Sequence, residues 1–173
     1  MAMFKDAIDK VLKNEGGFND IPQDKGSATN YGISLRFYQS KIDSNATKDT
    51  IKNLTRQDAE DIYFQYFWHN NKYDEIKAQV LAEKLLDISV NMGNTIANRF
   101  CQKAYNALGL KKLEVDGIMG SNTIDELNKC SQENIINMIS YIKIFQKNYY
   151  LEIVSNRPDQ HIFLKGWLNR ADN

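Results

Sequence analysis

The stretch from Glu15 to Ser34 constrains this chain more than any other part of it. It holds four of the nine glycines and one of the two prolines, together with three carboxylates and several small hydroxyl and amide side chains. The residues on both sides of it have the apolar periodicity of helices. A long polar segment between two helices costs ordering entropy, so in a compact domain it usually serves a function. We therefore look for the chemistry of the protein in this stretch.

Glu15 stands at the end of the first helical pattern, directly before Gly16-Gly17. The pattern runs over residues 2–14, and two glycines after it would end the helix and allow positive φ. A carboxylate at this place projects from a rigid element and lies at the negative end of the helix dipole. That position should raise its pKa, as a general acid working near neutral pH requires.

The residues after the glycines predict a hairpin. Residues 18–20 and 29–33 can pair as two short strands, with residues 22–26 in the turn between them. Asp20 and Asp24 would then face the helix end across a groove. Two carboxylates placed in this way can hydrolyse a glycosidic bond, because one protonates the leaving oxygen and the other activates water or stabilises the oxocarbenium-like state. The alternative is an ordered surface hairpin with solvated turn residues.

Several motifs, in the right order and spread over nearly the whole chain, resemble the glycoside hydrolase family 108 muramidases. They are Glu-Gly-Gly-Phe at 15–18, Pro-x-Asp-x-Gly at 22–26, Thr-Asn-Tyr-Gly-Ile-Ser at 29–34, and residues 86–93 and 163–170. These small lysozyme-like proteins of phages and bacteria include endolysins, and some serve as secretion activators. The resemblance implies a mainly α, lysozyme-like fold of two packed helical lobes, with a short β-hairpin next to the end of the catalytic helix.

The resemblance also implies an activity, the hydrolysis of the β-1,4 bond between N-acetylmuramic acid and N-acetylglucosamine in peptidoglycan. Glu15 would be the general acid. Asp24 follows it by nine residues, as the second carboxylate does in phage-type lysozymes, and would position or activate water. Those lysozymes place a threonine fifteen residues after the glutamate, where this chain has Asn30, with Thr29 one residue earlier. Either side chain could assist with the water.

The candidates for substrate contact are Asp20, Thr29, Asn30 and Tyr31 in the hairpin and Asn91 on a later helix. Asn91 shares a helical face with Asp87, four residues before it. The two could form a buried hydrogen-bonded pair that positions helices, or Asn91 could border the cleft.

Aromatic residues follow a helical stripe that includes Tyr63 and Phe67, with Trp68 and Tyr73 nearby. Such rings can line sugar subsites. At helical spacing, however, they more often belong to the core, and that is our prediction for Trp68 and Tyr73.

The helical patterns predict a catalytic lobe over residues 1–93 and a closely packed second lobe over 94–173, with a single domain over 1–173 as the alternative. The second lobe resembles the helical modules that bind peptidoglycan, through the Asp-Gly-x-x-Gly-x-x-Thr element at 116–123. We interpret that element as a structural turn. A long helix should then run from the cap Ser131 to about Ser155.

Composition narrows the function. The chain has 173 residues, with 22 basic and 22 acidic side chains and a net charge of zero, which argues against a nucleic-acid partner. Cys101 and Cys130 predict thiols rather than a disulfide in a cytosolic chain. Neither His69 nor His161 has another ligand at metal-binding spacing, so we expect no metal and no other cofactor.

The same considerations bear on location. No apolar run approaches the roughly 20 residues that span a bilayer, so we expect no integral membrane segment. The first six residues contain no apolar signal core. We expect a monomer that is made in the cytoplasm without a signal peptide. It would act in the periplasm or cell wall after release or export, helped by a holin or another export partner.

Two other functions stay open. A non-catalytic peptidoglycan-binding or secretion-accessory protein could keep this fold without useful turnover. A lytic transglycosylase would need the acid but no group that activates water.

Overall fold

The structure is a computed structural model that describes residues 1–14, 17–20 and 28–172. Glu15 and Asp24 lie outside these residues. The helices are α1 (Phe4–Asn14), α2 (Leu35–Lys41), α3 (Lys48–Lys52), α4 (Arg56–Tyr63), α5 (Gln79–Met92), α6 (Asn94–Ala107), α7 (Ser121–Leu127), α8 (Gln132–Asn156) and α9 (His161–Asp172). Short helical turns are η1 (Phe64–Trp68, a π-helix), η2 (His69–Asn71), η3 (Tyr73–Glu75) and η4 (Pro158–Gln160). The mainly α, lysozyme-like prediction is confirmed.

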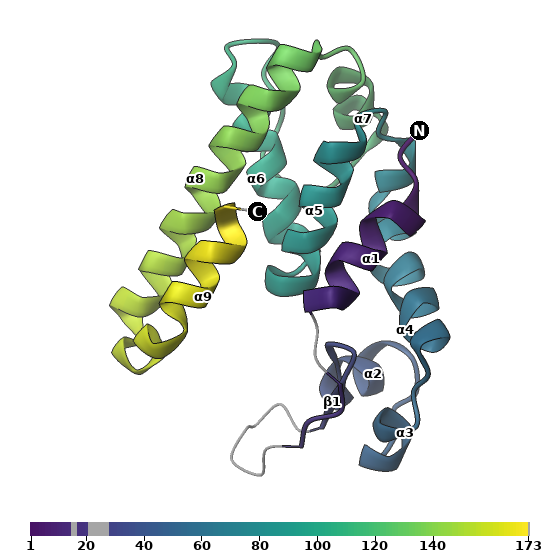
Figure 1. The fold of residues 1–173 in the computed structure, drawn as a ribbon. Coiled ribbons are helices and arrows are strands. Elements are labelled where there is room, and N and C mark those ends of the chain that lie inside the picture. The colour runs from purple at the N-terminus through teal and green to yellow at the C-terminus, as the bar shows by residue number, and fades with distance from the viewer. Residues whose placement is uncertain (15–16, 21–27, 173) are drawn as a thin grey trace.

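The long helices form one body and the strands form part of another. Helices α5, α6 and α8 lie side by side, α9 returns along α8, and α1 packs on α5 (Figure 1). The strands β1 (Thr29–Asn30) and β2 (Ile33–Ser34) lie with α2 and α3 in a small group beyond the end of α1. The strands thus lie apart from the long helices, together with α2 and α3.

Local capping sets where several helices begin. Ser34 Oγ accepts a hydrogen bond from Phe37 N at 3.1 Å, which starts α2. Thr55 and Asp58 form a reciprocal capping box at the start of α4, and Ser131 caps α8. These caps were readable in the sequence because each partner lies three residues from the cap.

Two clusters of buried side chains hold the structure. The larger extends from Ala2 to Ile142 and includes the predicted face of α1, with Ile8 and Val11 almost fully buried. The smaller lies under the hairpin and consists of Ala28, Leu35, Ala46 and Ile51. Since the larger cluster draws on residues from both halves of the chain, the halves share one core.

The predicted hairpin is confirmed in part. Asn19 of the predicted first strand pairs with Thr29 of the second through an antiparallel bridge. The predicted turn at 22–26 lies outside the described residues. The structure adds a tighter hairpin within the predicted second strand, in which Thr29 pairs with Ser34 and Asn30 with Ile33 around the turn Tyr31–Gly32. Both turn residues have positive φ, 50° and 78°, and the sequence did not predict this turn because positive φ is uncommon for a tyrosine.

The Asp-Gly-x-x-Gly element is a turn, as predicted. Gly117 has φ 83°, and its N–H donates to Gln102 Oε1 at 2.8 Å. Asp116 Oδ1 accepts from Ile118 N at 2.8 Å and from Gln102 Nε2 at 2.7 Å. The element therefore fastens the loop before α7 to α6.

Candidate functional site

Helix α1 directs the chain into the candidate site. It ends at Asn14, immediately before Glu15, and its buried face packs on α5. Val11 and Leu12 are 2% and 7% exposed, so this face of the helix is packed into the core. Residue 15 follows directly after this helix in the chain.

A cavity of about 140 Å³ borders the hairpin, between β2, the α4–η1 segment and α5. Three aromatic residues form much of its wall, with Tyr63 and Phe67 rings 5.4 Å apart and Phe37 and Phe67 rings 5.3 Å apart. Gly32, Ser34 and Val90 complete it. The sequence assigned Tyr63 and Phe67 to a packing stripe, and its only signal for a cavity was the concentration of rings.

Tyr63 also fixes the hairpin turn. Its hydroxyl donates to the carbonyl oxygen of Tyr31 at 2.8 Å. This bond connects Tyr63, in the wall of the cavity, to Tyr31, whose φ is 50°. It helps to hold this otherwise unfavourable backbone conformation.

Asn30 has a structural role that its motif did not reveal. The residue is only 5% exposed. Its Nδ2 lies 3.1 Å from the carbonyl oxygen of Ile51 and 3.3 Å from those of Lys52 and Leu54. The amide therefore ties the hairpin to the end of α3, and these contacts favour a positioning role over direct contact with a substrate.

The structure places the other hairpin candidates nearer the surface. Thr29 is half-buried, and its backbone exchanges two hydrogen bonds of 2.8 Å with Asn19. Asp20 is exposed and bonds Lys48 Nζ at 2.9 and 3.0 Å. This ion pair attaches the segment before the hairpin to the first residue of α3.

Asp87 and Asn91 do not bond to each other. Arg170 of α9 donates to Asp87 Oδ1, whereas Asn91 Oδ1 accepts from the Tyr150 hydroxyl at 2.8 Å. The idea of a mutual pair is thus wrong, because each side chain bonds to a different C-terminal helix. Asn91 itself is exposed.

Trp68 and Tyr73 belong to the core, as predicted, with exposures of 1% and 0%. The Tyr73 hydroxyl donates to Asn98 Oδ1 at 2.7 Å and lies 2.8 Å from Ser89 Oγ. Burial raises the pKa of Tyr73 far above its ordinary value, so this hydroxyl stays protonated. Neither ring is available as a sugar subsite.

Comparison with known proteins decides the family. Residues 8–93 match the family described as glycosyl hydrolase 108, and residues 96–172 match one described as "Predicted Peptidoglycan domain". The N-terminal half belongs to the glycosyl hydrolase 108 family. The resemblance noted in the sequence is confirmed, and these two families support a role in hydrolysing or binding peptidoglycan at the cell wall.

SagA of Brucella abortus is a solved structure similar to this chain. The identity is 28%, the match covers 98% of this chain and 89% of SagA, and the TM-score is 0.76. No curated protein matches the chain.

The two matched regions meet at Asn91, a predicted substrate contact. The Tyr150 that bonds Asn91 lies in the second region, and its ring stacks on Trp167 at 5.2 Å. Burial raises the pKa of Tyr150, which keeps it a donor to Asn91. The side chain of Asn91 is thereby held by a residue of the second region.

Two kinds of feature are absent from the residues that the structure describes. Among them, no three His, Cys, Asp or Glu side chains are grouped to hold a metal ion. None of the helices in these parts of the chain has the length and apolarity needed to cross a bilayer.

Proposed function

We propose that this protein is a muramidase that hydrolyses the β-1,4 bond between N-acetylmuramic acid and N-acetylglucosamine, with Glu15 as general acid. The observation that carries the proposal is the glycosyl hydrolase 108 match over residues 8–93, which includes the Glu-Gly-Gly motif. The end of α1 at Asn14 supports it, because a fixed helix leads straight to Glu15. An acid that must meet one glycosidic oxygen benefits from such rigid support.

Asp24 is proposed as the second carboxylate. Glu15 protonates the leaving glycosidic oxygen while a water molecule, activated or positioned by Asp24, attacks the anomeric carbon from the opposite face. In such an inverting reaction the two carboxyl groups stand roughly 6.5–9.5 Å apart. A product that retains the β configuration would contradict this role for Asp24.

The remaining candidates take different parts in the proposal. Thr29, which is half-buried at the strand beside the cavity, is the better placed of the two residues near the threonine position of phage-type lysozymes. Asn30 acts as a positioning residue. Asp20, Tyr31 and Asn91 are proposed to line the path of the glycan strand.

Further properties follow from this proposal. We infer that the two lobes, 1–93 and 94–173, work as one unit because they share a core. The protein would act as a monomer at the cell wall. It would arrive there through a holin or another export partner, as an endolysin or as a secretion activator.

The test is lysis of cells or sacculi by wild type and by Glu15→Gln. We expect the variant to lose activity and keep the circular dichroism spectrum of wild type. Asp6→Asn is the matched control, because Asp6 is an exposed carboxylate on the same helix. Full lysis by Glu15→Gln would reject the proposal.

The peptidoglycan-domain match over residues 96–172 favours one alternative, a non-catalytic wall-binding or secretion-accessory protein. In that case the protein would sediment with purified sacculi and release no soluble glycan. A lytic transglycosylase would instead leave anhydro ends on its products.

A further inference from the structure

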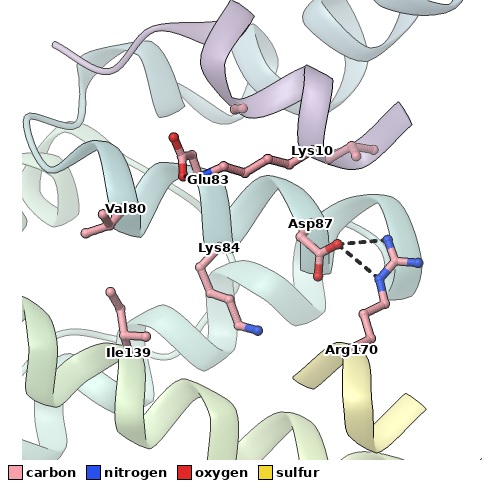
Figure 2. A pocket seen from close by; sticks show the side chains of 9 residues that line it. Lys10, Val80, Glu83, Lys84, Asp87, Ile139 and Arg170 are labelled. Atoms are coloured by element: carbon pink, nitrogen blue, oxygen red, sulfur yellow. Dashed lines mark hydrogen bonds and ion pairs between the residues drawn. The ribbon is translucent and has the colours of Figure 1, made fainter. Parts of the chain in front are cut away.

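A second cavity, of about 260 Å³, lies between α1, α5, α8 and α9 (Figure 2). Its lining includes apolar residues such as Val11 and Ile139. The charged side chains that line it are Lys10, Glu83, Lys84, Asp87 and Arg170. Three cations and two carboxylates leave a surplus of one positive charge, which favours an anion.

The two carboxylates are already bonded. Glu83 accepts hydrogen bonds from Lys10 Nζ and from Gln79 Nε2. Asp87 Oδ1 accepts from Arg170 Nε at 3.0 Å and pairs with Nη2 at 2.9 Å, as the dashed lines of Figure 2 show. These contacts neutralise the negative charges on the wall of the cavity.

Lys84 differs, since it is 6% exposed and has few partners. Among the described residues, its one hydrogen bond goes to the carbonyl oxygen of Ala171, at 3.0 Å. An ammonium group has three donors, and buried donors are normally satisfied. A carboxylate in the cavity could accept from those that remain.

The charges around Lys84 do not remove its need for further hydrogen-bond acceptors. Desolvation by burial lowers its pKa to about 8, with Lys143 of α8 and Arg170 of α9 acting in the same direction. Asp87 and Asp172 oppose the shift without reversing it. A bound anion would favour the protonated ammonium.

The cavity also lies near the cavity beside the hairpin, along α5. Asp87 lines it, and Val90, about one turn further along α5, lines the cavity beside the hairpin. Val11 lines it as well, one turn before the end of α1 at Asn14. If a glycan strand binds beside the hairpin, it lies about one helical turn along α5 from this cavity.

We propose that this cavity binds a carboxylate of the peptide that branches from N-acetylmuramic acid, so that the enzyme prefers peptide-bearing glycan. This inference rests on the proposed function. The volume suits a group the size of one amino acid, since it is below the roughly 300 Å³ at which typical ligand pockets begin. The stem peptide carries carboxylates on such groups.

The first experiment measures binding, which needs no catalysis. The probe is the tripeptide alanyl-γ-glutamyl-diaminopimelate, titrated by calorimetry into wild type, Lys84→Met and Lys10→Glu at pH 7. We expect affinity to fall about tenfold or more in Lys84→Met, the loss of a charged hydrogen bond. Lys10 is exposed, so Lys10→Glu keeps the fold and should also weaken binding. The exposed Lys5 of the same helix, changed to Glu, is the matched control and should bind like wild type.

Two more arms identify the source of the carboxylate. The tripeptide with its carboxylates converted to amides should lose binding, and free glutamate should bind much more weakly than the tripeptide. Equal affinity of wild type and both cavity variants for the tripeptide would overturn the proposal. So would binding of free glutamate to wild type as tightly as the tripeptide. Affinity should also fall between pH 7 and pH 9, because Lys84 loses its proton through about pH 8.

A second experiment separates this inference from the proposed function. Wild type is given intact peptidoglycan and glycan strands stripped of peptides by an amidase. Faster cleavage of intact material by wild type, and equal rates by Lys10→Glu, support the cavity. If neither substrate is cleaved, the muramidase proposal fails. The calorimetric binding measurements then still test whether the cavity binds the peptide carboxylate.

Discussion

The group around the hairpin and the helical body are held together in different ways. The body buries a continuous set of large side chains from α1 to α8. The hairpin group has a small cluster of its own, made of Ala28, Leu35, Ala46 and Ile51, and the Asn30 amide joins its parts. The part next to the proposed active site thus depends on a few directional bonds, so a single polar change there should impair the site and leave the body folded.

The largest expected effect is in the body. Leu85 is fully buried, so Leu85→Ala should lower the free energy of unfolding by about 2–5 kcal/mol through lost burial and a residual cavity. Denaturant unfolding followed by circular dichroism measures this. Val80→Ala on the same helix, where Val80 is 55% exposed, should change little. Equal effects of the two variants would mean that the body does not depend on this core.

Asn30→Ala should act locally. It removes the amide that donates to the carbonyl oxygens of Ile51, Lys52 and Leu54, at a cost of about 1–3 kcal/mol. We expect a marked loss of activity and faster hydrogen exchange in residues 28–54, with slow exchange retained in α5 and α6. Asn53→Ala, an exposed amide in the same segment, is the control. A uniform loss of protection across the whole chain would show that the two regions are not separable.

Tyr63→Phe should have a smaller effect. It removes the hydroxyl that donates to Tyr31 O, a bond worth about 0.5–1.5 kcal/mol, and keeps the ring in the cavity wall. Activity should fall because the hairpin turn is held less firmly. Tyr141→Phe on α8 serves as the control. If activity is unchanged while the Asn30 variant loses it, the turn does not need this bond.

The smallest effect is electrostatic and appears only on acidification. Hydrogen bonds from Lys129, Tyr105 and Lys111 lower the pKa of Glu126 from 4.5 to about 2. Because the folded pKa is lowered, the contribution to stability is present above about pH 4.5 and is lost as the pH falls toward 2. The stability difference between wild type and Glu126→Gln should therefore shrink over this interval. A constant difference would mean that Glu126 carries no such linkage.

The sequence predicted what local interactions decide. The cap at Ser131 and the helix before Glu15 depend on neighbours within a few residues or on helical period, and both were found. The tight turn at Tyr31–Gly32 was missed because it depends on positive φ at Tyr31.

Long-range partners were not predictable. Asn30 bonds to carbonyl groups more than 20 residues away, and Arg170 lies 83 residues from Asp87. Nothing in the local pattern around either residue marks its partner. Asn30, chosen from its motif as a substrate contact, therefore turned out to hold the hairpin group together. The proposed roles of Glu15 and Asp24 stay predictions.

The central claim is that Glu15 is the acid of a muramidase, and the most direct measurement is digestion of purified peptidoglycan by wild type and Glu15→Gln, with mass spectrometry of the released fragments. The account predicts fragments with reducing muramic acid ends from wild type and none from the folded variant. The same fragments from both proteins, or none from folded wild type, would contradict it.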